Sequence, residues 1–214
     1  MTEASASDRI VAGVDEVGRG ALFGPVVAAA VVLNAASTDE LLRLGVRDSK
    51  QLSPLRRQAL ADAVQRLALD CRIGLASVRE IDRLNILQAS LLAMKRAILG
   101  LTPQPTLCLI DGNQRVPNLP IEQQTLVKGD QRDCAIAAAS ILAKVWRDTL
   151  ITRLDRRYPG YDLASNKGYG SAKHRQALAW LGPSPQHRQS FRPCQGAAVN
   201  PEQLSLLVTT QGSP

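Results

Sequence analysis

The sequence predicts an α/β fold in which a mixed sheet is covered by helices and followed by a helical C-terminal lobe. Apolar segments of strand length, rich in Val and Ile, alternate with segments of helical periodicity through the first part of the chain. The first two apolar segments, 10–14 and 26–33, follow one another closely enough to form a hairpin. After the fifth apolar segment the pattern is helical, with glycine-rich breaks.

Local signals place the individual elements. The expected strands are 10–14, 26–33, 72–78, 106–110 and 122–127. The expected helices are 54–69, a helix from 82 or 85 to 99, 135–148 and 172–181. Ser53 and Ser171 are suitable N-caps, and Gly100 with Pro103 ends the second helix. Residues 34–51 are expected to be a connection, and the segment after Gly182, rich in Pro, Gln, Ser and Arg, could wrap the surface or be partly disordered.

Composition limits the class of protein. Aromatic residues are only 3% of the 214, so the core must be built from Ala, Val, Ile and Leu. The net charge of +7 favours a polyanionic partner such as nucleic acid. No apolar segment approaches the ~20 residues of a membrane span. The four cysteines are widely spaced and show no CxxC pattern, which argues against a zinc site and is typical of reduced thiols in a cytoplasmic protein.

Four carboxylates stand where strands or glycine turns end. Asp15 and Glu16 end the first strand, Asp111 ends the fourth, and Asp130 follows Gly129 just before a helix. Neighbouring side chains on a strand point to opposite faces, so Asp15 and Glu16 can reach one point only if the pleat breaks, which Gly18 would permit. If the first and fourth strands are neighbours, Asp15 and Asp111 can face one another across ~5 Å.

Such a set of oxygen ligands, without Cys or His, suits two Mg²⁺ or Mn²⁺ ions that could activate water against a phosphodiester. Each acid also has an ordinary alternative role. The pair at 15 and 16 could be solvated acids at a strand end, Asp111 a turn residue, and Asp130 an acid near a helix N-terminus.

Several motifs together resemble the ribonuclease HII family, bacterial type 2 ribonuclease H, over roughly residues 10–193. In chain order they are Val14-Asp-Glu-Val-Gly-Arg-Gly20, Gly24-Pro-Val-Val-Ala28, Asp48-Ser-Lys50, Leu84-Asn-Ile-Leu-Gln88, Ile110-Asp-Gly-Asn113, Lys128-Gly-Asp130, Ala138-Ala-Ser-Ile-Leu-Ala-Lys-Val145 with Arg147-Asp148, Asn166-Lys-Gly-Tyr-Gly170 with His174, and His187-Arg-Gln-Ser-Phe191. After Gly20 the chain has Ala-Leu-Phe23 where the family more often has Pro-Leu-Ala. Phe23 is bulky and could alter packing near the site.

The resemblance implies a ribonuclease H-like, mixed five-stranded sheet flanked by helices, with a C-terminal helical region. It implies a catalytic domain over 9–192 with its helical lobe from about 150, a disordered segment 1–8, and a tail, 193–214, whose composition allows flexibility. The expected enzyme is a cytoplasmic monomer that does not associate with membranes. It hydrolyses RNA in RNA–DNA hybrids and at single ribonucleotides in duplex DNA, leaving 5′-phosphate and 3′-hydroxyl ends, with roles in DNA repair and replication.

The implied site uses Mn²⁺ or Mg²⁺ bound by the four acids, Asp15, Glu16, Asp111 and Asp130, the last completing a second metal site. Backbone groups of Gly18, Arg19 and Gly20 would sense the 2′-hydroxyl, and Tyr169 would pack on the neighbouring deoxyribose. The candidate phosphate contacts are Ser49, Lys50, Ser140 and Lys144. Alternatively, Tyr169 packs on the lobe and Lys144 pairs with Asp148. His174 and His187 are expected to be structural hydrogen-bonding residues.

Two other functions fit part of the pattern. A basic nucleic-acid-binding module without catalysis would explain the charge, but it would gain nothing from four acids that repel phosphate. A two-metal nuclease specific for DNA would explain the acids, but Gly18-Arg19-Gly20 and Tyr169 would then have no ribose to sense.

Overall fold

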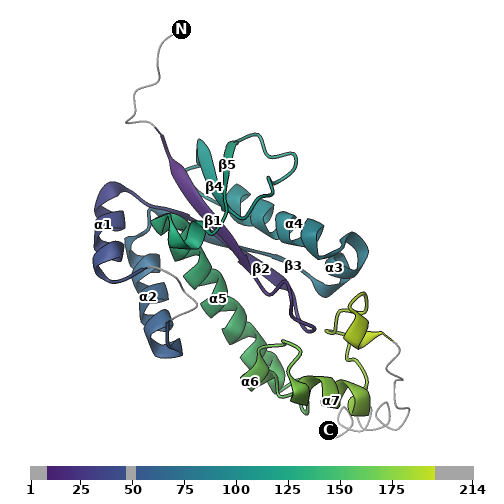
Figure 1. Cartoon of the computed structure of the whole chain (residues 1–214). Coiled ribbons are helices and arrows are strands. Elements are labelled where there is room, and N and C mark those ends of the chain that lie inside the picture. Colours follow the sequence, from purple (N-terminus) through teal and green to yellow (C-terminus); the bar gives the residue numbers. More distant parts are fainter. Residues whose placement is uncertain (1–8, 47–51, 196–214) are drawn as a thin grey trace, which may run out of the picture.

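The computed structural model describes residues 9–46 and 52–195, and its described part contains one mixed five-stranded sheet (Figure 1). The sheet has the order β3-β2-β1-β4-β5. Its strands are β1 (Val11–Val17), β2 (Val26–Val32), β3 (Asp70–Ala76), β4 (Leu107–Asp111) and β5 (Glu122–Leu126). β1, β2 and β3 are antiparallel neighbours, whereas β4 is parallel to β1 and to β5. The predicted mixed sheet is therefore confirmed, with β1 at its centre.

Helices cover both faces of the sheet (Figure 1). They are α1 (Ala35–Arg43), α2 (Pro54–Leu67), α3 (Val78–Leu84), α4 (Ile86–Leu99), α5 (Cys134–Asp155), α6 (Leu163–Asn166) and α7 (Ala172–Leu181), with 3₁₀ turns η3 (Gly129–Gln131) and η4 (Arg192–Cys194). Alternate residues of β2 pack in opposite directions: Val26 and Ala28 join the core beneath α4, whereas Val27 and Ala29 join the core beneath α2 and α5. A strand buried on both faces explains the uninterrupted apolar sequence of β2.

Small residues bring α5 close to the central strand. A Cβ atom built on Gly13 would lie 2.2 Å from the carbonyl carbon of Ala135, so only glycine fits beneath the helix there. The alanines at 137–139 are fully buried against the sheet in the same way. This close approach sets the level of α5, whose following turns carry Ser140 and Lys144 past the ends of β1 and β4.

A third cluster forms the core of the C-terminal lobe, which joins the turn after β1 to α5, α6 and α7. Phe23 is fully buried there, and its ring meets those of Tyr158 and His187 edge-on at centroid distances of 5.4 and 5.0 Å. Phe23, which differs from the residue more usual in the family, is thus part of the core of the lobe.

Several boundaries differ from the prediction because capping signals outweighed the apolar pattern. The expected connection 34–51 contains α1, which Asn34 caps by accepting from the Ser37 amide. Of the two expected starts for the second helix, 85 is confirmed, because Asn85 is the N-cap of α4. The additional helix α3, which precedes it, was not predicted and begins at a capping box formed by Ser77 and Glu80. β3 begins and ends two residues earlier than predicted, and α5 continues to Asp155.

The expected break in the pleat is wrong. The pairing of β1 with β2 continues without interruption through Asp15, Glu16 and Val17, and Gly18 adopts a positive φ of 91° only after the strand has ended. The two acids therefore occupy successive positions of a regular strand.

The segment after Gly182 is ordered over its described part. Residues 184–191, which we term the strap, lie against the lobe and carry the fully buried His187 and Arg188. Over the described residues, no helix has the length and apolar character that a membrane crossing requires.

Candidate active site

The parallel pairing of β1 and β4 brings two carboxylates to the same level of the sheet. Val14 pairs with Ile110, so the next residues along the two strands are Asp15 and Asp111, and the condition under which the sequence predicts that these acids face one another is met. Both line a hollow of about 420 Å³. Its wall consists of Asp15, Glu16, Val17, Arg57, Asp111, Ser140, Lys144 and Tyr169. The structure thus brings three of the four predicted acids together in one hollow.

The hollow concentrates negative charge at its base. Asp15 is only 6% exposed, and its pKa is raised well above the usual value by burial first and then by the charges of Glu16 and Asp111. Hydrogen bonds from the Ser140 hydroxyl and the Glu16 amide lower that pKa in part. Burial also raises the pKa of Glu16, although Arg19 Nη1, 3.2 Å from Glu16 Oε1, opposes the shift.

Asp130 lies on a different element from the other acids. It is 3% exposed in the 3₁₀ turn η3, and it is not part of the wall of the hollow. The turn is nevertheless tied to the site, because the amide of Gly129 donates to Asp111 Oδ1 at 2.7 Å. Asp130 is therefore held one residue away from the group that orients Asp111.

The donor set fits a hard divalent cation. The charges of Glu16 and Asp111 raise the pKa of Asp15, and the charge of Asp111 raises that of Glu16, so a cation among the three carboxylates would relieve this repulsion. In the described part of the chain, no three Asp, Glu, His or Cys side chains are close enough together to hold a metal ion by themselves. Mg²⁺ is commonly bound by one or two carboxylates together with water and substrate oxygens, which needs no such group of three.

The residues expected to meet nucleic acid surround the same hollow. Lys144 Nζ lies 3.0 Å from Asp148 Oδ1 and 5.6 Å from the centre of the Tyr169 ring, so the alternative i,i+4 pairing is present at the wall of the hollow. Ser140 lies beside Asp15. Tyr169 forms an isolated bridge with Ala21, which places it against the turn after β1.

The turn after β1 exposes part of its backbone. Gly18 is buried, whereas Arg19 and Gly20 are exposed at the end of the strand that carries the acids. Ser49 and Lys50 lie outside the described residues.

A family model described as Ribonuclease HII matches residues 12–194. The chain belongs to the ribonuclease HII family. It is 68% identical to the ribonuclease HII of Acaryochloris marina over 189 residues, covering 88% of this chain and 96% of that protein. It is 64% identical to that of Trichormus variabilis, covering 87% and 83%.

The fold comparison agrees. The ribonuclease H2 of Pyrococcus horikoshii superposes with a TM-score of 0.74 at 27% identity, covering 86% of this chain and 95% of the other. The predicted ribonuclease H-like fold is confirmed, and the chain is a ribonuclease H, an endoribonuclease of RNA paired with DNA.

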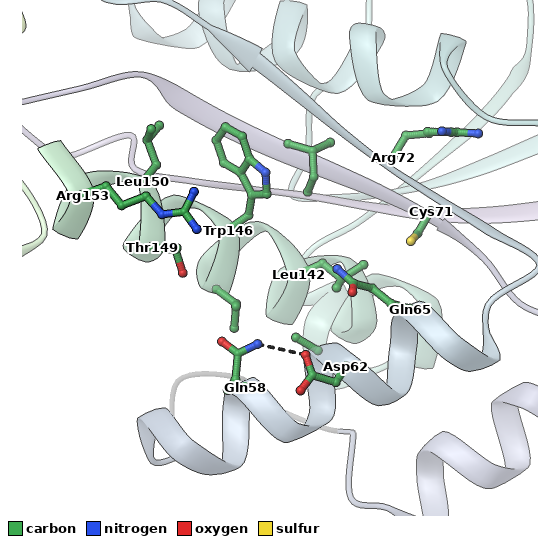
Figure 2. A pocket seen from close by; sticks show the side chains of 13 residues that line it. Gln58, Asp62, Gln65, Cys71, Arg72, Leu142, Trp146, Thr149, Leu150 and Arg153 are labelled. Carbon is green, nitrogen blue, oxygen red and sulfur yellow. Dashed lines mark hydrogen bonds between the residues drawn. The ribbon is translucent and has the colours of Figure 1, made fainter.

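A second hollow, of about 450 Å³, lies on the other side of α5, between that helix, α2 and β3 (Figure 2). Its wall includes the half-exposed Trp146 and one carboxylate, Asp62, which accepts a hydrogen bond from Gln58 Nε2 at 2.9 Å. The wall of this second hollow supplies one carboxylate, whereas the wall of the first supplies three.

Sequence reasoning assigned no role to three arginines that shape the site. Arg57 lines the hollow, and Arg147 and Arg188 are fully buried behind the turn after β1. Arg147 and Arg188 fall within the family motifs, but arginine is usually a surface residue, and only the fold reveals that these two are interior. The available signal for Arg147 was its position in an alanine-rich helix.

Proposed function

We propose that this ribonuclease H hydrolyses the RNA strand of hybrids and also cuts at single ribonucleotides embedded in duplex DNA. Two divalent cations, Mg²⁺ or Mn²⁺, would assist, and the products would be 5′-phosphate and 3′-hydroxyl ends. We further propose that it acts as a cytoplasmic monomer that removes ribonucleotides left in DNA. The observation that carries the proposal is the meeting of Asp15, Glu16 and Asp111 in one hollow of a strongly basic chain.

The acids would hold the cations. Asp15 and Asp111 end neighbouring parallel strands, Glu16 lies beside them, and Asp130 would complete the second metal site through the turn that supports Asp111. Such a pair of ions supplies an activated water and stabilises the leaving oxygen of a phosphodiester. The Ser140 hydroxyl keeps Asp15 oriented and favours its ionised form, the form that binds metal.

The rim would position the duplex. Lys144 and Arg57 bring positive charge to the wall of the same hollow, where it could hold phosphates without reading sequence. Ser140, Ser49 and Lys50 are the further phosphate contacts in this proposal. The exposed backbone of Arg19 and Gly20 would meet the 2′-hydroxyl, and the Tyr169 ring would pack on the next sugar, where a second 2′-hydroxyl would clash.

Incubation with a DNA duplex that contains one ribonucleotide tests the proposal. We expect a single cut at that ribonucleotide with Mg²⁺ or Mn²⁺ and none with EDTA. Asp111→Asn should abolish the cut and leave hybrid binding nearly intact, because the amide oxygen can still accept from Gly129 while one metal ligand loses its charge. Asp62→Asn, in the second hollow, is the matched control and should cut normally. Cleavage by Asp111→Asn at the wild-type rate would contradict the metal assignment.

A further inference from the structure

Two buried guanidinium groups hold the turn after β1, residues 18–25, from behind. Arg188 donates from Nη1 to the Arg19 carbonyl at 2.8 Å and from Nε to the Gly24 carbonyl at 3.0 Å. Its own backbone amide donates to the Leu22 carbonyl at 2.9 Å. Arg147 donates to the carbonyls of Phe23 and Pro25 at 2.9 and 3.1 Å. The carbonyls of this turn are thus drawn into the protein at several successive positions.

Inward carbonyls determine where the amides point. In a trans peptide the C=O and the following N–H point in opposite directions, and the peptide that joins Arg19 to Gly20 is trans. Because the Arg19 carbonyl is directed inward at Arg188, the Gly20 N–H is directed outward. Gly20 is exposed, and no group in the described part of the chain accepts from its amide. This N–H is a fixed donor facing solvent beside the acids.

Glycine makes the external support necessary. Gly20 restricts its own backbone less than any other residue would, so the peptide before it could rotate unless something held it. The strap provides the hold: Asp82 in α3 accepts from the amides of Gln189 and Ser190 at 3.1 and 2.9 Å, fixing the segment that carries Arg188. The planar guanidinium holds two donor nitrogens, Nε and Nη1, in a fixed geometry toward the carbonyls of Gly24 and Arg19, whereas lysine offers a single rotating nitrogen.

Burying two guanidinium groups behind the turn is energetically costly, which argues that the geometry they impose on the turn has a function. Both guanidinium groups are buried, and no carboxylate in the described part of the chain forms an ion pair with either of them. Burial, together with repulsion from Arg147, lowers the pKa of Arg188 to about 9. Buried Arg188 Nη2 has no hydrogen-bond partner, so the side chain is oriented by its two bonds to the turn.

We propose that Arg188 is a positioning residue that sets ribonucleotide specificity by holding the Gly20 N–H toward the 2′-hydroxyl of the substrate. The inference rests on the proposed function, because it requires that the turn after β1 meets the ribose. Arg188 would then determine the discrimination between ribose and deoxyribose without touching nucleic acid itself.

Binding without metal tests the assignment. The affinity of the EDTA-treated protein is measured for a duplex with one ribonucleotide and for the same duplex made only of DNA. Arg188→Lys should lower the ratio of the two affinities by about three- to tenfold, the worth of one hydrogen bond, while affinity for the DNA duplex stays unchanged. Arg192→Lys, an exposed arginine in η4, is the matched control and should keep the wild-type ratio.

A second measurement uses the wild-type protein, so it tests the Gly20 contact on which the inference depends even if Arg188→Lys does not fold. Amide hydrogen exchange at Gly20 should be fast in the free protein and slowed at least tenfold by the ribonucleotide duplex, but not by the DNA duplex. Equal exchange with both duplexes, or a folded Arg188→Lys protein with an unchanged affinity ratio, would overturn the inference. Failure of the wild type to cut the ribonucleotide duplex would instead overturn the proposed function.

Discussion

The Nε2 atoms of His174 and His187 lie 3.0 Å apart, with both imidazole rings fully buried in the C-terminal lobe. The neighbouring bonds fix the tautomers. The Ser184 amide can only donate, so His187 Nδ1 accepts and its proton is on Nε2. His174 Nε2 then accepts, and His174 Nδ1–H donates to the Tyr169 carbonyl at 2.9 Å. Two neutral rings thus connect the strap to the backbone of Tyr169.

The two buried neutral histidines predict that the free energy of unfolding falls on acidification. Burial lowers the pKa of both rings, that of His187 to about 3, and His174 adds repulsion to the latter. Between the unfolded value near 6.5 and the folded values, the unfolded chain binds protons that the folded chain does not. For each such proton, the folded state therefore loses about 1.4 kcal/mol of stability per unit fall in pH.

Urea unfolding from pH 7.5 to 4.5 measures the effect by comparison with His187→Gln. The comparison is needed because the raised pKa values of Asp15 and Glu16 act in the opposite direction, adding stability as pH falls. The variant should show a weaker loss on acidification, by roughly one proton's contribution. Parallel stability curves for the two proteins would show that His187 is not held neutral by the fold.

The sequence was sufficient for the mixed sheet and for the gathering of three acids in one hollow, because both depend on local patterns. An acid after an apolar strand, seen at Asp15 and again at Asp111, indicated that the two side chains could face one another if these strands were neighbours, and the structure pairs β1 with β4. The buried hydrogen-bonding roles expected for His174 and His187 are confirmed.

The rest depends on long-range contacts that no local pattern contains. The Arg188 side chain bonds residues 169 and 164 positions away in sequence, so its role becomes visible only when the strap lies behind the turn. The same is true of Asp82, whose partners are 107 and 108 positions away. The missed helix α1 has another cause: it is only nine residues long and begins with Ala, Ser and Thr, so the Asn34 cap is the main signal for its start.

Asp15→Asn is expected to stabilise the metal-free protein while abolishing cleavage. Because the pKa of Asp15 is raised in the folded protein, ionisation of this carboxyl destabilises the fold relative to the unfolded chain, where the pKa is near 4. This destabilisation is present at pH 8 and disappears on acidification. Removing the charge should add about 1 kcal/mol or more at pH 8 and little near pH 4. Thermal unfolding in EDTA at the two pH values measures this.

The same variant separates charge repulsion from a packing effect. Mg²⁺ should raise the melting temperature of the wild type, because the cation offsets the repulsion, and should raise that of Asp15→Asn much less. Asp62→Asn should behave like the wild type in both media, since its carboxylate lies in the second hollow. A destabilised Asp15→Asn protein at pH 8 would contradict the account of the charge.

Two glycines of the turn after β1 should respond differently to alanine. At Gly18 the added Cβ would lie 2.2 Å from Arg147 Nε, and φ is 91°, so Gly18→Ala should lose about 2 kcal/mol or more of stability.

At Gly20 a Cβ meets no atom within 4 Å, so Gly20→Ala should be close to the wild type in stability. Its cleavage of the ribonucleotide duplex should nevertheless fall at least tenfold, because the methyl group obstructs close approach of the sugar. Stable Gly20→Ala protein with full activity would exclude that approach.

Tyr169 offers the clearest separation of ring from hydroxyl. Its ring lies over Lys144 Nζ and the Arg147 guanidinium at 5.6 and 5.5 Å from the ring centre, while its backbone is held by Ala21 and His174. Tyr169→Ala should therefore keep the fold but lose the ring that packs on the deoxyribose. We expect cleavage at a single ribonucleotide in DNA to fall at least tenfold more than cleavage of a continuous hybrid.

Tyr169→Phe keeps the ring and should retain most of the preference, measured as the ratio of kcat/KM for the two substrates. An equal loss on both substrates in Tyr169→Ala would assign the ring to general positioning of Lys144 instead, because displaced phosphate contacts weaken binding to every duplex alike.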